Sequence, residues 1–196
     1  MNTPLLIVEY FERHAKLTET EKRLLISSFK LIRVKKRQLL IQPGFVAKSR
    51  YFVLNGAMKA YVIGGKGQEH TIQLAINEWW ISDYNSYIFQ QPANMFVMAV
   101  EDGELLEISF DDEQKLKSFS RTFDTFFRII SEKSVAFMQR RLISNLTLSA
   151  EERYNLFLEK YPVMVNRFPQ YVIASYLGMT TEFLSKIRNQ KIKQKS

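Results

Sequence analysis

The spacing of hydrophobic residues changes twice along this sequence and divides the chain into three parts. Residues 3–30 have a helical spacing, and residues 31–110 hold short apolar runs separated by turn residues. From Phe110 onward, neither glycine nor proline occurs before Pro162. Short runs between turns are typical of strands, and a long stretch without Gly or Pro favours helix. We therefore expect a β-rich unit set between helical segments.

Six runs rich in β-branched, aromatic and leucine residues are predicted to be strands. Asn55-Gly56 separates two of them and predicts a hairpin, because Asn-Gly favours the tight turns that join antiparallel strands. Strands that recur roughly every ten residues are typical of a sandwich or a barrel. The six runs are Arg37–Ile41, Arg50–Leu54, Met58–Val62, His70–Ala75, Phe96–Ala99 and Glu104–Ser109.

The long helix predicted after the last strand carries an apolar stripe. Its members fall at alternating steps of three and four residues, which is the spacing of a seam between two helices. We expect this stripe to join two copies of the chain. The alternative is that the helix packs on its own β-rich unit, to which Phe127 and Ile129 on other faces would contribute. The stripe comprises Leu116, Phe119, Phe123, Phe126 and Ile130.

Composition excludes several classes of function. The sequence has no cysteine, which excludes disulfides, thiolate nucleophiles and Cys-ligated metals. The sequence has only two histidines, His14 and His70, which gives little basis for a multi-histidine metal site or a His-based catalytic triad. The N-terminus lacks a basic start, and no apolar run approaches the about eighteen residues of a membrane span. We expect a cytoplasmic binding protein without metal or cofactor, and not an enzyme.

Positive charge is concentrated near the end of the sequence. Residues 140–196 contain ten Lys and Arg against four Asp and Glu, whereas residues 1–139 contain eighteen against sixteen. This asymmetry indicates a polyanionic partner, but a lysine-rich tail can equally serve to solvate the terminus. Charge alone leaves both interpretations open.

A helix-turn-helix pattern lies within this basic segment, behind a helix predicted to start near Pro169. Ala174, Gly178 and Leu184 have the spacing Ala-x3-Gly-x5-Leu. The small residue lets two helices cross closely, glycine supplies a left-handed turn residue, and leucine anchors the second helix on the first. The spacing alone has many false matches, but its place at the basic end strengthens the prediction.

The second helix of this pattern is predicted to present a polar face to DNA. Side chains on that face can hydrogen-bond base edges or phosphates, and Lys191, Lys193 and Lys195 follow as phosphate-attracting charge. The candidate DNA-binding residues are Thr180, Thr181, Glu182, Ser185, Lys186, Arg188 and Asn189.

The order of these parts resembles the CRP/FNR family of bacterial transcription regulators. The resemblance rests on the run Tyr51–Gly56, on the long helix, and on the run Pro169–Gly178 followed by Thr181-Glu182-x-x-Ser185-Lys186. It implies that Glu182, Ser185 and Lys186 take the glutamate, serine and arginine places of the family's recognition helix. It also implies an α+β fold: an N-terminal jelly roll of the cyclic-nucleotide-binding type (1–112), a long dimerisation helix (113–146) and an all-α helix-turn-helix domain (147–196).

One segment departs from the family members that bind cyclic AMP. Those members carry a glutamate that holds the ribose and, about ten residues later, an arginine that neutralises the cyclic phosphate. Here Glu78 would keep the glutamate place, but the arginine position falls at Ala93-Asn94. A buried phosphate without a cation is costly, so cyclic AMP is not expected. Glu78, Trp79, Trp80 and Asn94 are candidates for the pocket of another effector, although such aromatic residues often belong to a core.

The resemblance implies a homodimeric transcription regulator that binds near-palindromic double-stranded DNA. A small effector and RNA polymerase are further candidate partners, and the jelly roll is either a sensor or a passive scaffold. About six residues follow the recognition helix, so we expect the family's β-hairpin wing to be missing. The alternative function is an effector-binding or adaptor protein whose basic end docks an acidic protein.

Overall fold

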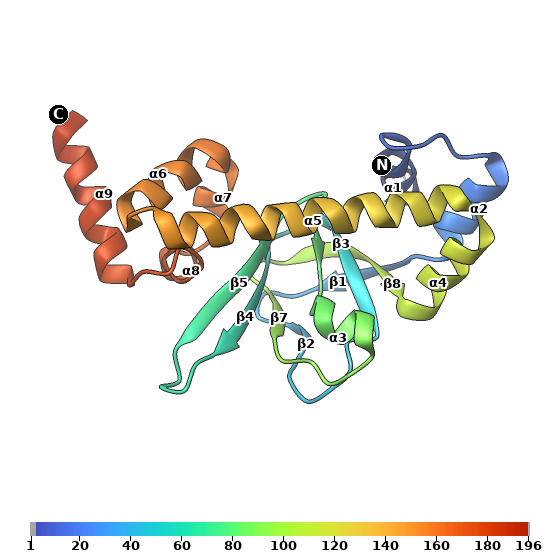
Figure 1. Ribbon diagram of the computed structural model, residues 1–196, viewed down its shortest axis with the longest axis horizontal. Coiled ribbons are helices and arrows are strands. Elements are labelled where there is room, and N and C mark those ends of the chain that lie inside the picture. The colour runs from blue at the N-terminus through green and yellow to red at the C-terminus, as the bar shows by residue number, and fades with distance from the viewer. Residues whose placement is uncertain (1–2, 196) are drawn as a thin grey trace.

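The computed structural model describes the backbone of residues 3–195 and the side chains of residues 6–190. Two N-terminal helices precede a β-rich domain, and a series of helices follows it (Figure 1). The β-rich domain contains β1 (Lys30–Val34), β2 (Leu39–Ile41), β3 (Ser49–Asn55), β4 (Met58–Ile63), β5 (Glu69–Ala75), β6 (Trp80–Ile81), α3 (Tyr84–Phe89), β7 (Phe96–Ala99) and β8 (Gly103–Ser109). The other helices are α1 (Thr3–Glu12), α2 (Glu19–Ser27), α4 (Phe110–Phe119), α5 (Arg121–Thr147), α6 (Ala150–Lys160), α7 (Pro162–Arg167), α8 (Gln170–Tyr176) and α9 (Thr181–Lys195).

Two four-stranded antiparallel sheets form the β-rich domain. The first has the strand order β1-β8-β3-β6, and the second has the order β2-β7-β4-β5. Side chains alternate between the two faces of a strand, so Tyr51 and Val53 of β3 meet Met58 and Ala60 of β4 in a shared core. The predicted α+β fold, with an N-terminal jelly roll followed by helices, is confirmed.

The turn at Asn55-Gly56 does not close a hairpin, so that prediction is wrong. β3 pairs with β6 and β8, whereas β4 pairs with β5 and β7, so the turn carries the chain from one sheet to the other. Gly56 has a φ of 108°, and a Cβ there would lie 2.9 Å from Cα of Gly103. Glycine is required by this close crossing as well as by the positive φ, and the dipeptide alone does not distinguish a crossing from a hairpin.

The single long helix predicted after the last strand is two helices. Ser120 is extended, with φ −150° and ψ 140°, and separates α4 from α5. Its Oγ accepts a hydrogen bond from the N–H of Thr122 and donates one to the carboxylate of Glu21 on α2. A serine cap thus ends one helix and begins the next without glycine or proline.

The predicted dimer seam forms part of the internal core, so this assignment is wrong. Leu116, Phe123 and Phe126 are at most 1% exposed, and the ring of Phe126 stacks on Phe11 of α1 at 3.5 Å. The remaining members are Ile130, half-buried against the same cluster, and Phe119, exposed on α4. The alternative holds: this helix packs on its own domain, because α1, α2 and the first sheet supply the covering surface.

α5 runs across the β-rich domain and joins it to the C-terminal helices (Figure 1). Its 27 residues span about 40 Å, which is enough to pass the sheets and continue beyond them. Within residues 3–195, no helix is both long and apolar enough to span a membrane.

Candidate functional site

α8 and α9 form the predicted helix-turn-helix. Gly178 lies in the turn with a φ of 68°, the left-handed conformation that glycine adopts without strain. Ala174 and Leu184 are each 1% exposed and meet at the crossing of the two helices, with Ile187 in the same core. The N–H of Met179 donates to the carbonyl of Ala174 and closes the turn. The three residues singled out by spacing therefore have the roles expected of them.

The face of α9 that points away from α8 is polar. Glu182, Lys186 and Asn189 are exposed on this face, since residues four and three apart lie together on a helix. Thr180 caps the helix, because its Oγ1 accepts a hydrogen bond from the N–H of Phe183 at 3.2 Å. Thr181 is half-buried in the first turn. The side chains of Lys191, Lys193 and Lys195 lie outside the described residues.

Two candidate DNA-binding residues contact the first helix of the motif. Gln170 of α8 donates from Nε2 to Oγ of Ser185 at 2.7 Å, and its Oε1 accepts from Arg188 at 3.3 Å. These hydrogen bonds set the angle between α8 and α9 and leave the outer edge of Arg188 exposed. Phe183 is 45% exposed on α9 and was not anticipated; such a ring can contact the methyl group of thymine.

Three of the four candidate effector residues lie together. Glu78, Trp79 and Trp80 line an open cavity of about 450 Å³ between the β-rich domain and α5. Phe137 of α5 forms part of the opposite wall, and its ring meets that of Trp79 edge to face at 5.8 Å. Asn94 does not line this cavity, so the structure does not bring it together with Glu78.

Glu78 is bound to the N-terminal region. It lies in the turn before β6 with a φ of 68°, and its two carboxylate oxygens accept from Arg13 at 2.6 and 2.7 Å. These hydrogen bonds hold the pKa of Glu78 below its ordinary value. Glu78 thus fastens the segment after α1 to the rim of the cavity.

Asp83 is the acid that faces Asn94, and sequence reasoning missed it. Its side chain is 1% exposed, and its Oδ2 accepts from the N–H groups of Asn94 at 2.8 Å and Met95 at 3.0 Å. Oδ1 accepts from the N–H of Ser86 at 3.1 Å and caps α3. A phosphate brought to this helix start would find the N–H donors occupied and would meet a fixed negative charge. The spacing Asp-x-x-Ser at 83–86 is an N-cap signal that could have identified it.

A buried charge cluster holds the start of α4 and α5 on β3. Nε of Arg50 lies 2.6 Å from the carboxylate of Glu113, and both side chains are at most 4% exposed. The guanidinium also lies over the rings of Trp80 and Phe127, at 4.6 and 4.7 Å. No local pattern predicts this pair, because its members are far apart in the sequence.

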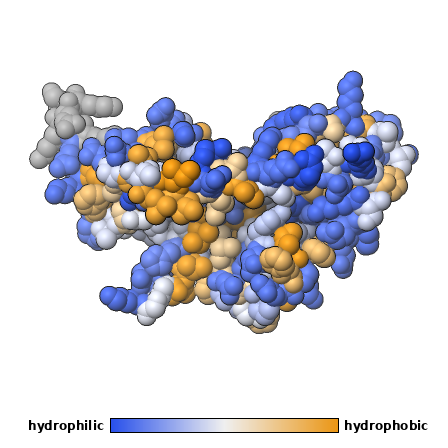
Figure 2. Space-filling model, in the orientation of Figure 1, coloured by the Kyte–Doolittle hydropathy of each residue, from blue (hydrophilic) through white to orange (hydrophobic). Residues whose placement is uncertain are grey.

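A different apolar stripe on α5 is uncovered. Figure 2 shows apolar surface over the C-terminal half of this helix. Its residues follow one another at steps of three, four and four, which places them on one face. They are Val135 (66% exposed), Met138 (43%), Leu142 (58%) and Leu146 (77%). Sequence reasoning missed this stripe because continuing the series from Leu116 leads to Lys133 and Phe137 instead.

The helix-turn-helix domain is fastened to the β-rich domain through β5. Oγ of Ser175 accepts from the N–H of Thr71 at 2.8 Å and donates to the carbonyl of Glu69. Arg141 of α5 donates to the carbonyls of Thr71 and Tyr176, at 3.0 and 2.8 Å. The position of α9 is therefore coupled to β5 and to the end of α5.

A comparison with known protein families identifies the family that the β-rich domain resembles. Residues 31–118 match the family model of the cyclic nucleotide-binding domain. No curated protein matches the chain at the level of sequence.

Solved structures resemble nearly the whole chain. FixK2 from Bradyrhizobium japonicum has a TM-score of 0.74 at 15% identity, over 85% of each chain. The c-di-GMP-responsive global regulator CLP from Xanthomonas campestris has a TM-score of 0.70 at 16% identity, over 90% of this chain and 93% of that one. A protein from Eubacterium rectale, described as belonging to the CRP/FNR family, has a TM-score of 0.68 at 16% identity, over 90% and 85%. The chain therefore has the fold of the CRP/FNR regulators.

Proposed function

We propose that this chain, with a cyclic nucleotide-binding domain inside a CRP/FNR fold, is a homodimeric transcription regulator that binds near-palindromic DNA. The observation that carries the proposal is the helix-turn-helix at the basic end of the chain. Its second helix has a free polar face that includes Glu182, Lys186 and Asn189. Glutamate can accept from a cytosine amino group, and lysine can donate to guanine or to a phosphate.

The second copy of the chain is proposed to cover the stripe Val135, Met138, Leu142 and Leu146. Four large apolar side chains in one row on a helix are costly to leave in water, and a two-fold axis lets the same row cover itself. Two such helices side by side would bring two copies of α9 to successive major grooves, about 34 Å apart.

The β-rich domain is proposed to act as a sensor or as a scaffold. As a sensor, it would take an effector into the cavity at Glu78, Trp79 and Trp80, which adjoins α5. Occupation would then shift α5 and the spacing of the two recognition helices. As a scaffold, it would offer its surface to RNA polymerase.

DNA binding is tested by a salt titration of wild type and of a double variant on the recognition helix. Glu182→Ala with Lys186→Ala should lower the affinity for the preferred site by about tenfold or more and abolish the preference over random DNA. The wild-type affinity should fall steeply with salt. The control, Glu9→Ala with Lys16→Ala, removes the same two charges from exposed positions near α1 and should change neither quantity. Unchanged sequence selectivity in the double variant would exclude α9 as the recognition helix. A DNA affinity of the wild type that depends only weakly on salt would favour an acidic protein partner.

Cyclic AMP is expected not to bind, because Asp83 occupies the N–H donors of Ser86, at the start of α3, and of Asn94 and Met95, in the loop after it. Calorimetric titration of the full chain with cyclic AMP should give only the heat of dilution. Saturable heat would contradict this assignment, since it would require the Asp83 carboxylate to leave its donors.

A further inference from the structure

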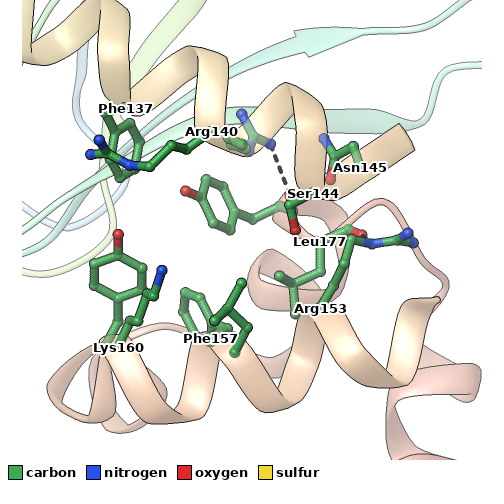
Figure 3. A pocket seen from close by; sticks show the side chains of 12 residues that line it. Phe137, Arg140, Ser144, Asn145, Arg153, Phe157, Lys160 and Leu177 are labelled. Atoms are coloured by element: carbon green, nitrogen blue, oxygen red, sulfur yellow. Dashed lines mark hydrogen bonds between the residues drawn. The ribbon is translucent and has the colours of Figure 1, made fainter. Parts of the chain in front are cut away.

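A pocket lies where the end of α5 meets α6 and α8. Twelve side chains line it, and four of them are cations: Arg140, Arg141, Arg153 and Lys160. None of the twelve is an Asp or a Glu. Figure 3 shows Arg140 of α5 and Lys160 of α6 on one side of the opening, with Arg153 on the opposite side. We call this site the hinge pocket, because it lies between the helix that leaves the β-rich domain and the helix-turn-helix domain.

The positive charge of the hinge pocket is not neutralised by the described part of the chain. Arg141 donates to the carbonyls of Ile72, Thr71 and Tyr176, and Arg153 donates to the carbonyls of Leu177 and Leu148. These acceptors are neutral. Arg140 and Lys160 are exposed and form no ion pair with any described residue.

Arg141 has an unused donor inside this region. Its Nε is buried and finds no acceptor among the described residues. Burial lowers the pKa of its guanidinium, since the charged form has lost water without gaining an anion. A buried donor without a partner costs free energy that an incoming acceptor recovers.

Half of the remaining lining residues are aromatic. Phe157 and Tyr176 are at most 7% exposed, and Phe137 and Tyr161 also line the cavity. The cavity volume is about 100 Å³, which leaves room for one oxyanion group. An aromatic or apolar substituent would then lie against the rings.

We propose that the hinge pocket binds a small aromatic or apolar ligand that carries a phosphate or carboxylate group. The oxyanion would bridge Arg140 of α5 and Lys160 of α6, since charge-assisted hydrogen bonds to such groups are strong. The ligand would therefore fix the angle between α5 and the helix-turn-helix domain. The hinge pocket adjoins the cavity at Glu78 and shares Phe137 and Arg140 with it, but Arg141, Arg153 and Lys160 line the hinge pocket and not that cavity.

Phenyl phosphate is a suitable probe, because it combines one ring with one doubly charged oxyanion. Calorimetric titration of the full chain at constant ionic strength, without DNA, should show one saturable site per chain. Phenol and inorganic phosphate should each bind more weakly, because phenol supplies only the ring and inorganic phosphate supplies only the oxyanion. Arg140→Gln with Lys160→Gln should weaken phenyl phosphate binding by about tenfold or more.

The matched control is Arg121→Gln with Lys66→Gln, which removes one Arg and one Lys at exposed positions away from the pocket. It should bind phenyl phosphate as wild type does. No saturable binding, or equal weakening in both variants, would overturn the proposal. It would also be overturned if phenyl phosphate failed to bind while the hinge variant alone lost salt-dependent DNA affinity, since the cations would then contact the DNA backbone. The titration contains no DNA, so its result does not depend on whether the chain binds an operator.

Discussion

Glu113 is the shared partner of three side chains at the base of α4. It forms ion pairs with Arg50 and Lys117, with N–O distances of 2.6 Å in each, and accepts a hydrogen bond from the hydroxyl of Tyr87 at 2.8 Å. The cluster joins β3, α3 and α4, and because Arg50 and Glu113 are buried, each group depends on the others. Burial and the nearby Glu113 carboxylate raise the pKa of Tyr87 far above its ordinary value, so this hydroxyl remains a donor.

Replacing Glu113 with glutamine should destabilise the chain by about 3 kcal/mol, because Arg50 would be left buried without a counter-ion. Chemical denaturation monitored by circular dichroism measures the loss. The control is Glu132→Gln, whose ion pair with Arg128 is more than half exposed on both sides and should contribute less than about 0.5 kcal/mol. Similar losses in the two variants would contradict the role given to the buried cluster.

Single residues differ in how well the sequence predicts them. Gly178 could be assigned from spacing, because one backbone conformation at the turn requires glycine. Arg50 and Glu113 could not, since the pair forms only when β3 and α4 meet in the folded domain. Asp83 is intermediate: its N-cap spacing is local, but its bonds to Asn94 and Met95 depend on the loop that follows α3.

At the scale of elements, α5 has two halves with different partners. Its first half, with Phe123 and Phe126, is sealed in the core beneath α1 and α2. Its second half exposes the stripe that includes Leu142 and Leu146. Periodicity predicts that an apolar face exists on a helix, but which face meets its own domain depends on elements distant in the sequence. For the same reason the break at Ser120, which is stabilised by Glu21 of α2, was not predicted.

Leu142→Glu should separate the dimer, because it places a charge in the middle of the uncovered stripe on both helices. Light scattering should report 23.1 kDa for the variant and twice that mass for wild type. Ile63→Glu makes the same change at another exposed apolar residue, on β4, and should leave the dimer intact. If the Leu142 variant keeps twice the chain mass, the interface lies elsewhere. Phe123→Glu is not a substitute, since it would disrupt the core.

At the scale of the whole molecule, one set of contacts joins the β-rich domain, α5 and the proposed recognition helix. α8 lies against β5, and Arg141 binds both of them from α5. The first turn of α9 and the β4–β5 hairpin also line a common cleft of about 610 Å³. A shift of α5, caused by a ligand at either pocket, would therefore move α9 relative to the sheets. The sequence predicts the order of these parts, but not this docking, because it depends on contacts between residues 35 to 104 positions apart.

The central claim is that two copies of this chain read DNA through α9. Selection of the full-length protein on a pool of random double-stranded DNA tests it most directly. The account predicts an enriched site with two-fold symmetry, whose half-sites are about one helical turn apart, and the site should disappear in the Glu182→Ala, Lys186→Ala variant. A pool that shows no enriched sequence, or an enriched site without symmetry that the variant still selects, would contradict the account.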